Sequence, residues 1–152
     1  MSTRSTSADL DRRNALPTQF CLVVGAVLLL AGIIGFFYNA SFTSDETDRD
    51  AVFGILDVNG WHNVVHVVTG LATLAFARTA PRLWAGVFGV VYLLVAIWGF
   101  IVGDGDSILS IIPVNTEDNI LHVILGLSGL AVYAASAPER GAATSPPRTA
   151  GA

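Results

Sequence analysis

The chain has 152 residues, of which 53% are hydrophobic and only 13% are charged, and its mean hydropathy is +0.62. A soluble domain carries roughly 25% charged residues, so the composition indicates that much of the chain has lipid as its solvent. The net charge of −4 argues against a nucleic-acid-binding protein, which requires a basic surface. The single cysteine, Cys21, excludes an internal disulfide.

Residues 1–19 are polar and show no apolar periodicity, which predicts a disordered cytoplasmic tail. The first membrane span is predicted at 20–38, because about 20 uncharged residues cross roughly 30 Å of hydrocarbon. This run is longer than the core of a cleaved signal peptide. Residues 25–36 also align with the internal segment 89–100. The first helix is therefore expected to belong to the fold.

Three further spans are predicted at 59–77, 83–102 and 117–136. Asn59 and Asn115 stand where the second and fourth helices should begin, and an Asn side chain can accept a bond from an unpaired N–H group of the first turn. The apolar stretch 52–58 is too short to span and is expected at the membrane surface or beneath the bundle. Residues 137–152 are rich in Pro, Ala and Gly, which predicts a disordered tail.

One sequence unit occurs twice, at 52–74 and again at 108–130, and both copies contain N-x3-N-x2-H-V-x2-G-L-x2-L. Two copies of one motif indicate a repeated structural unit. Each unit includes two predicted spans, so both copies must enter the membrane in the same direction. The predicted class is an all-α, polytopic membrane protein whose four transmembrane helices form two parallel two-helix repeats.

The arginines predict the orientation of the chain. Seven of the eight fall on one side of the predicted spans: Arg4, Arg12, Arg13, Arg78, Arg82, Arg140 and Arg148. Basic residues accumulate on the cytoplasmic side, so both termini are predicted to be cytoplasmic in a bacterial plasma membrane. The two long loops, which hold most of the acidic residues, are then outside.

A polar layer is predicted near the outer ends of the second and fourth helices. Its residues are Asn59, Asn63, His66, Asn115, Asp118, Asn119 and His122. Ionisable side chains inside a membrane are costly, so by default they are functional candidates. Polar side chains also commonly tie membrane helices together, and this structural role is the leading hypothesis.

Two alternative hypotheses use the same histidines. His66 and His122 share a depth and could ligate a haem b iron from both sides, with His62 as an additional metal ligand and Asp118 at the matching position of the second copy. A histidine near the outer surface could instead sense pH or conduct protons, because its ordinary pKa is about 6.5.

The sequence contains no pattern of catalytic residues, Gly-rich phosphate loop or cysteine pair with metal spacing. We therefore expect a non-enzymatic membrane protein that requires no cofactor and binds no nucleic acid. The glycines of the spans are expected to let helices pack closely within one bundle, and a homodimer interface is the alternative.

The motif F-G-I-L-D-V-N-x3-N-x2-H, with the later P-V-N-x2-D-N-x-L-H, resembles a bacterial family of small four-helix membrane proteins. That family is catalogued only as a domain of unknown function (family number 4383). The resemblance covers residues 20–135. It implies four membrane helices and a prominent role for the polar layer, and it implies no activity.

Overall fold

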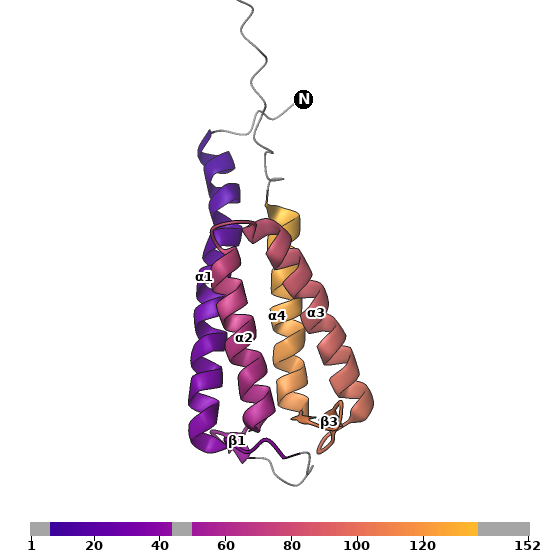
Figure 1. Cartoon of the computed structure of the whole chain (residues 1–152). Coiled ribbons are helices and arrows are strands. Elements are labelled where there is room, and N and C mark those ends of the chain that lie inside the picture. The colour runs from indigo at the N-terminus through magenta and orange to yellow at the C-terminus, as the bar shows by residue number, and fades with distance from the viewer. Residues whose placement is uncertain (1–6, 44–49, 137–152) are drawn as a thin grey trace, which may run out of the picture.

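The computed structural model describes residues 7–43 and 50–136. Within them, four helices run side by side along the length of the molecule (Figure 1). These helices are α1 (Ser7–Tyr38), α2 (Gly60–Phe76), α3 (Pro81–Val102) and α4 (Thr116–Ala135). The chain is thus mostly helical, as predicted. Three of the helices are long and apolar enough to cross a membrane: α3, α4 and the Ala15–Tyr38 part of α1.

The prediction that residues 1–19 are disordered is wrong for residues 7–19, because α1 already begins at Ser7. Extending an existing helix adds one hydrogen bond per residue and avoids the cost of a new nucleus. Ala, Leu and Arg, which are frequent in this segment, also have high helix propensity. The remainder of the two predicted tails, residues 1–6 and 137–152, lies outside the described residues.

The all-α class also needs a correction, because the short apolar stretches before α2 and α4 form β-hairpins. The first pairs β1 (Asp50–Val52) with β2 (Leu56–Val58), and the second pairs β3 (Ser107–Ile108) with β4 (Ile112–Pro113). Alternating apolar residues with β-branched members suit such strands, and these stretches are too short for a stable helix. Both hairpins lie at the same end of the bundle, opposite the α2–α3 connection (Figure 1).

Glycines bring the helices together within the α1–α2 pair and within the α3–α4 pair. A Cβ atom on Gly25 would lie 3.0 Å from the carbonyl oxygen of Gly70, and one on Gly89 would lie 2.8 Å from that of Gly126. Such distances are tighter than a side chain normally tolerates, so the absence of a side chain permits the close approach. Equivalent glycines therefore make equivalent contacts in the two helix pairs.

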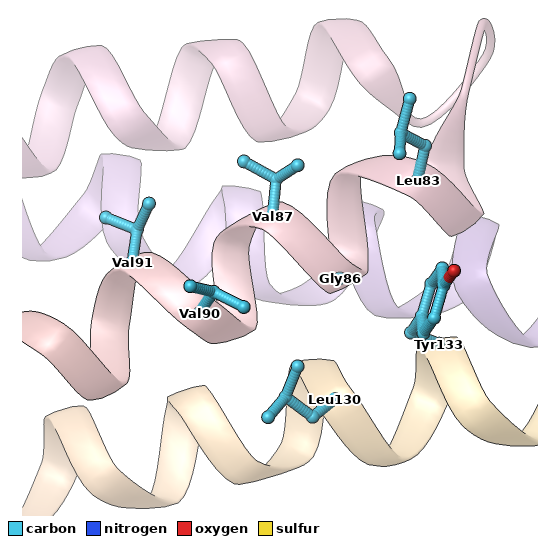
Figure 2. Close-up of a pocket in the computed structure, with 7 residues that line it drawn as sticks. All are labelled: Leu83, Gly86, Val87, Val90, Val91, Leu130 and Tyr133. Carbon is cyan, nitrogen blue, oxygen red and sulfur yellow. The ribbon is translucent and has the colours of Figure 1, made fainter.

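The outward faces of the helices are strongly apolar. Phe37 is 85% exposed and Ile101 is 77% exposed, whereas the central core is small and is built on Leu28, Phe88 and Tyr92. A groove of about 370 Å³ between α3 and α4 is also lined by apolar side chains and the ring of Tyr133 (Figure 2). Exposed apolar surface on this scale suits contact with lipid.

Candidate functional site

Asn59 and Asn115 cap α2 and α4, as the sequence predicts. Their side-chain Oδ1 atoms accept hydrogen bonds from the backbone N–H groups of His62 and Asp118, both at 2.9 Å. Each cap satisfies one of the donors that a helix start leaves unpaired. Both side chains then have an amide group available for a second partner.

The second partner of each cap lies in the other repeat. Nδ2 of Asn59 donates to the carbonyl oxygen of Ile111 at 2.7 Å, and Nδ2 of Asn115 donates to that of Ile55 at 2.7 Å. Ile55 and Ile111 are the last turn residues of the two hairpins, directly before β2 and β4. Strand β2 accordingly lies against α4, β4 lies against α2, and β2 and β4 contact each other. We call these two reciprocal hydrogen bonds the cap exchange.

His62 and Asp118 occupy equivalent positions and contact equivalent backbone segments of the opposite hairpin. The carboxylate of Asp118 accepts a hydrogen bond from the N–H of Asp57 at 3.0 Å. The residue equivalent to Asp57 in the second repeat is Pro113, which has no N–H group. Facing it stands His62, whose imidazole lies beside the backbone of Pro113 and Asp57. The Asp118 carboxylate therefore faces an N–H donor, whereas the His62 imidazole faces a backbone segment that offers only a carbonyl group.

Asn63 and Asn119 do not belong to the histidine group and contact the neighbouring helix of their own pair. Nδ2 of Asn63 donates to the carbonyl oxygen of Asn39 at 2.8 Å, at the end of α1. A Cβ atom on Gly35 would clash with the side chain of Asn63, and one on Gly99 would clash with that of Asn119. Asn63 therefore fastens α2 to α1 through a hydrogen bond, and Asn119 packs closely against α3.

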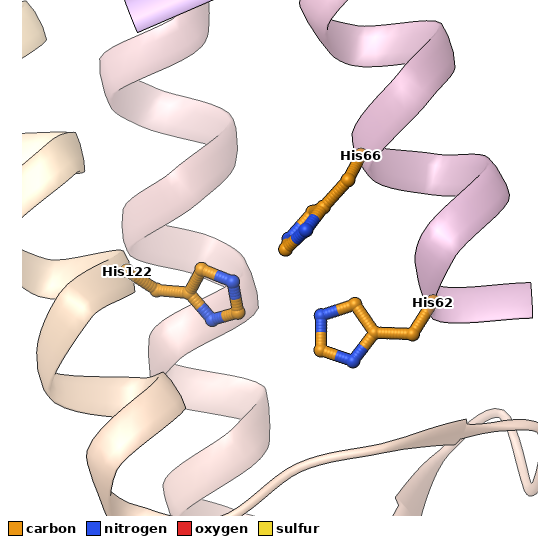
Figure 3. A group of neighbouring side chains, drawn as sticks. All are labelled: His62, His66 and His122. Carbon is orange, nitrogen blue, oxygen red and sulfur yellow. The ribbon is translucent and has the colours of Figure 1, made fainter. Parts of the chain in front are cut away.

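The structure brings His62, His66 and His122 together between α2 and α4, with their rings pointing toward one another (Figure 3). Their nearest ligating nitrogen atoms all lie within 4.8 Å of one another. The ring centroids of His62 and His66 are 4.6 Å apart, and those of His62 and His122 are 6.4 Å apart. Nδ1 of His62 and Nδ1 of His122 are buried and have no hydrogen-bond partner.

Two cavities adjoin this group, and His66 lines both. The first, the histidine cavity, has a volume of about 120 Å³ and contains all three histidines. The second, the Asp118 cavity, has a volume of about 300 Å³ and lies between α1 and the first hairpin, with Asp118 and His66 in its wall. Cofactor pockets usually measure 300–1,000 Å³, so the histidine cavity is too small for a haem between His66 and His122.

Sequence reasoning missed Tyr92 and Thr69, which complete the wall of the histidine cavity. The ring of Tyr92 stands edge-on to His122 at 5.4 Å, and its hydroxyl is hydrogen-bonded to Thr69. A signal was present in the alignment of 25–36 with 89–100, where Tyr92 is the polar replacement for Leu28.

A comparison with protein families bears on the identity of this site. The model of the family described as domain of unknown function DUF4383 matches residues 19–135. The chain belongs to this family. The matched region contains both hairpins, the cap exchange and the three histidines, so these features all lie within the family's domain. No curated protein and no solved structure matches the chain.

Proposed function

We propose that the protein is a non-enzymatic, multi-pass membrane protein in which two parallel helical hairpins are coupled at their outer ends. The cap exchange is the observation that carries this proposal. Each repeat contributes a helix cap and a hairpin, and each cap bonds to the hairpin of the other repeat. The polar layer in this proposal fastens helices and holds a fixed surface toward the outside.

The number of membrane crossings is part of the same proposal. Helix α2 has 17 residues and is shorter than the three helices that qualify by length and composition. It packs along α1 over its length. In the matching repeat, α4 packs along α3 in the same way and is long enough to span. We therefore propose four crossings and two parallel repeats related by an axis along the membrane normal.

The distribution of charge supports an orientation with both termini in the cytoplasm of a bacterial cell. Arg78 and Arg82 lie at the α2–α3 connection, whereas Asp104 and Asp106 follow α3 at the hairpin end. An excess of arginine on one side favours retention of that side in the cytoplasm. The hairpins and the histidine group would then lie at the outer face.

Cysteine labelling in intact cells tests this orientation. Cys21→Ser provides a background without cysteine, since Cys21 is the chain's single cysteine. On that background, a membrane-impermeant thiol reagent should label Asp104→Cys at the outer turn. It should label Thr79→Cys, at the α2–α3 connection, only after the cells are opened. Labelling of Thr79→Cys in intact cells, or equal labelling of the two variants, would contradict the proposed orientation.

A further inference from the structure

The histidine cavity contains a feature that the coupling of the two repeats does not require. His62 is 2% exposed and His122 is 7% exposed, yet Nδ1 of each ring has no hydrogen-bond partner. Buried polar atoms are nearly always paired, and an exception calls for an explanation such as an absent ion. These two rings belong to one group of three imidazoles, and Nε2 of His62 and of His122 points toward the other rings of the group (Figure 3).

From this convergence we propose that His62, His66 and His122 bind one divalent transition-metal ion of the zinc class. Imidazole is a preferred ligand of zinc, copper, iron and nickel. Four tetrahedral ligands at 2.0–2.1 Å from a zinc ion lie about 3.4 Å from one another. The three histidine nitrogens already lie within 4.8 Å. Small rotations of the side chains would therefore suffice to close the site around an ion.

The surroundings of His62 match those of a metal ligand. A ligating histidine normally donates its second ring N–H to a carboxylate or a backbone carbonyl, which fixes the orientation of the ring. In Figure 3, Nε2 of His62 points toward the other two rings, whereas Nδ1 lies on the side of the ring that faces away from them, and the backbone of Pro113 and Asp57 lies beside the imidazole. Nε2 of His62 is therefore the atom that would bind an ion through its lone pair, and Nδ1–H would be directed to the backbone side.

The cavity also provides room for a fourth ligand. Its volume of about 120 Å³ exceeds the space that one water molecule needs. Apart from the histidines, Thr69 and Tyr92, its lining is apolar: Val65, Val91, Val95, Ile108, Ile112 and Val114. Three protein ligands and one exchangeable position are the arrangement of an open zinc site. Asp118 lines the neighbouring cavity together with His66.

The site requires both repeats, because α2 contributes two ligands and α4 contributes one. At the position equivalent to His62 the second repeat has Asp118, which is engaged by the backbone of Asp57. The duplication therefore produces one site with three histidines and no symmetric second copy of it. We expect a stoichiometry of one metal ion per chain.

Metal titration of the full-length protein tests this proposal. The chain contains three histidines in total, so the protein is purified in mild detergent with a tag that contains no histidine. Metal-free protein should bind one Co²⁺ ion per chain with a visible absorption band, and Zn²⁺ should displace the ion. X-ray absorption of the zinc form should then show three imidazole nitrogens at about 2.0–2.1 Å.

Single variants identify the ligands. His62→Ala, His66→Ala and His122→Ala should each weaken Co²⁺ binding by at least about tenfold, since removing even an outer partner of a ligand costs that much. Ser128→Ala is the control, because Ser128 does not line the histidine cavity and its hydroxyl donates to the carbonyl oxygen of Leu125 within α4, so binding should be retained. Where an alanine variant loses helical structure, the His→Asn variant at that position, which is closer in size and polarity, replaces it.

Absence of stoichiometric Co²⁺ and Zn²⁺ in the wild-type protein would overturn the metal site. Retention of wild-type affinity in the three histidine variants, or binding only at several weak positions, would do so as well. None of these outcomes bears on the cysteine labelling or on the cap exchange, so the metal site and the proposed coupling can fail independently.

Discussion

At the scale of single residues, the two repeats achieve the same contact with different side chains. Asp118 accepts a hydrogen bond from the backbone N–H of Asp57, and the imidazole of His62 lies beside the backbone of Pro113, where no N–H exists. A carboxylate at position 62 would face a carbonyl group without a donor, which is unfavourable for a buried charge. The replacement of Asp by His is therefore explained by the Asp-to-Pro change in the opposite strand.

The cap exchange permits a prediction at a single residue. Asn59→Asp keeps an oxygen that caps α2 but loses the amide that donates to Ile111. It leaves a carbonyl group unpaired beside a new negative charge, so stability should fall by about 1–3 kcal/mol. Unfolding in detergent, followed by circular dichroism, measures the change. Asn115→Asp should behave alike, and wild-type stability in both variants would show that the exchange contributes nothing.

At the scale of elements, both hairpins contain strained turns at equivalent positions. Phe53 and Leu109 have φ angles of 55° and 56°, and Ser110 has 58°. This left-handed region costs a bulky residue roughly 1–2 kcal/mol. The turns make the next carbonyl group, that of Ile55 or Ile111, available to the cap of the other repeat. The strained backbone of each turn therefore lies directly beside the carbonyl group that takes part in the cap exchange.

Relief of that strain should stabilise the second hairpin. Leu109 is 62% exposed, so its replacement loses little buried apolar area. Asn tolerates the left-handed region, and Leu109→Asn should therefore raise stability by about 0.5–1 kcal/mol. Leu109→Ile is the contrasting control, since a β-branched residue tolerates a positive φ poorly and should lower the unfolding midpoint. A lower midpoint for Leu109→Asn than for the wild type would contradict this account.

At the scale of the whole molecule, residue contacts between helices are densest within each helix pair. Helix α1 packs on α2 and α3 packs on α4, and contacts between the pairs are sparser. The hairpins add to them by placing β2 against α4 and β4 against α2. The bundle thus consists of two helix pairs that hold each other through α1, through the small core around Phe88 and through the hairpins at one end.

Division of the chain tests this organisation. Residues 1–79 and 80–152, expressed together as two fragments, each contain one helix pair and should co-purify as a complex. Removal of both cap-exchange bonds by Asn59→Ala with Asn115→Ala should weaken the complex about tenfold or more, since two hydrogen bonds contribute about 1–3 kcal/mol. Leu94→Ala, on the exposed face of α3, is the control. Equal recovery of the wild-type complex, the double asparagine variant and the Leu94→Ala control would exclude the cap exchange as the coupling element.

Features that depend on local pattern could be predicted before the fold was known. Uncharged runs of sufficient length predicted the helices, and Asn59 and Asn115 predicted their starts, because capping involves groups within one turn. The helical extension of α1 to Ser7 and the two hairpins were missed. Short segments of this kind have weak patterns of their own, and they form because a long helix or a neighbouring element stabilises them.

The tertiary structure decided which polar side chains meet. Residues three apart on a helix differ by about 60° around the axis and residues four apart by about 40°, so a modest rotation separates their partners. Asn63 consequently faces α1, whereas His62 and His66 face His122 on α4. The cap exchange likewise depends on how the two hairpins, which are distant in sequence, pack against the opposite helices. The sequence therefore identified the polar layer, and only the packing of α2 against its neighbours divided it into helix fasteners and a group of three histidines.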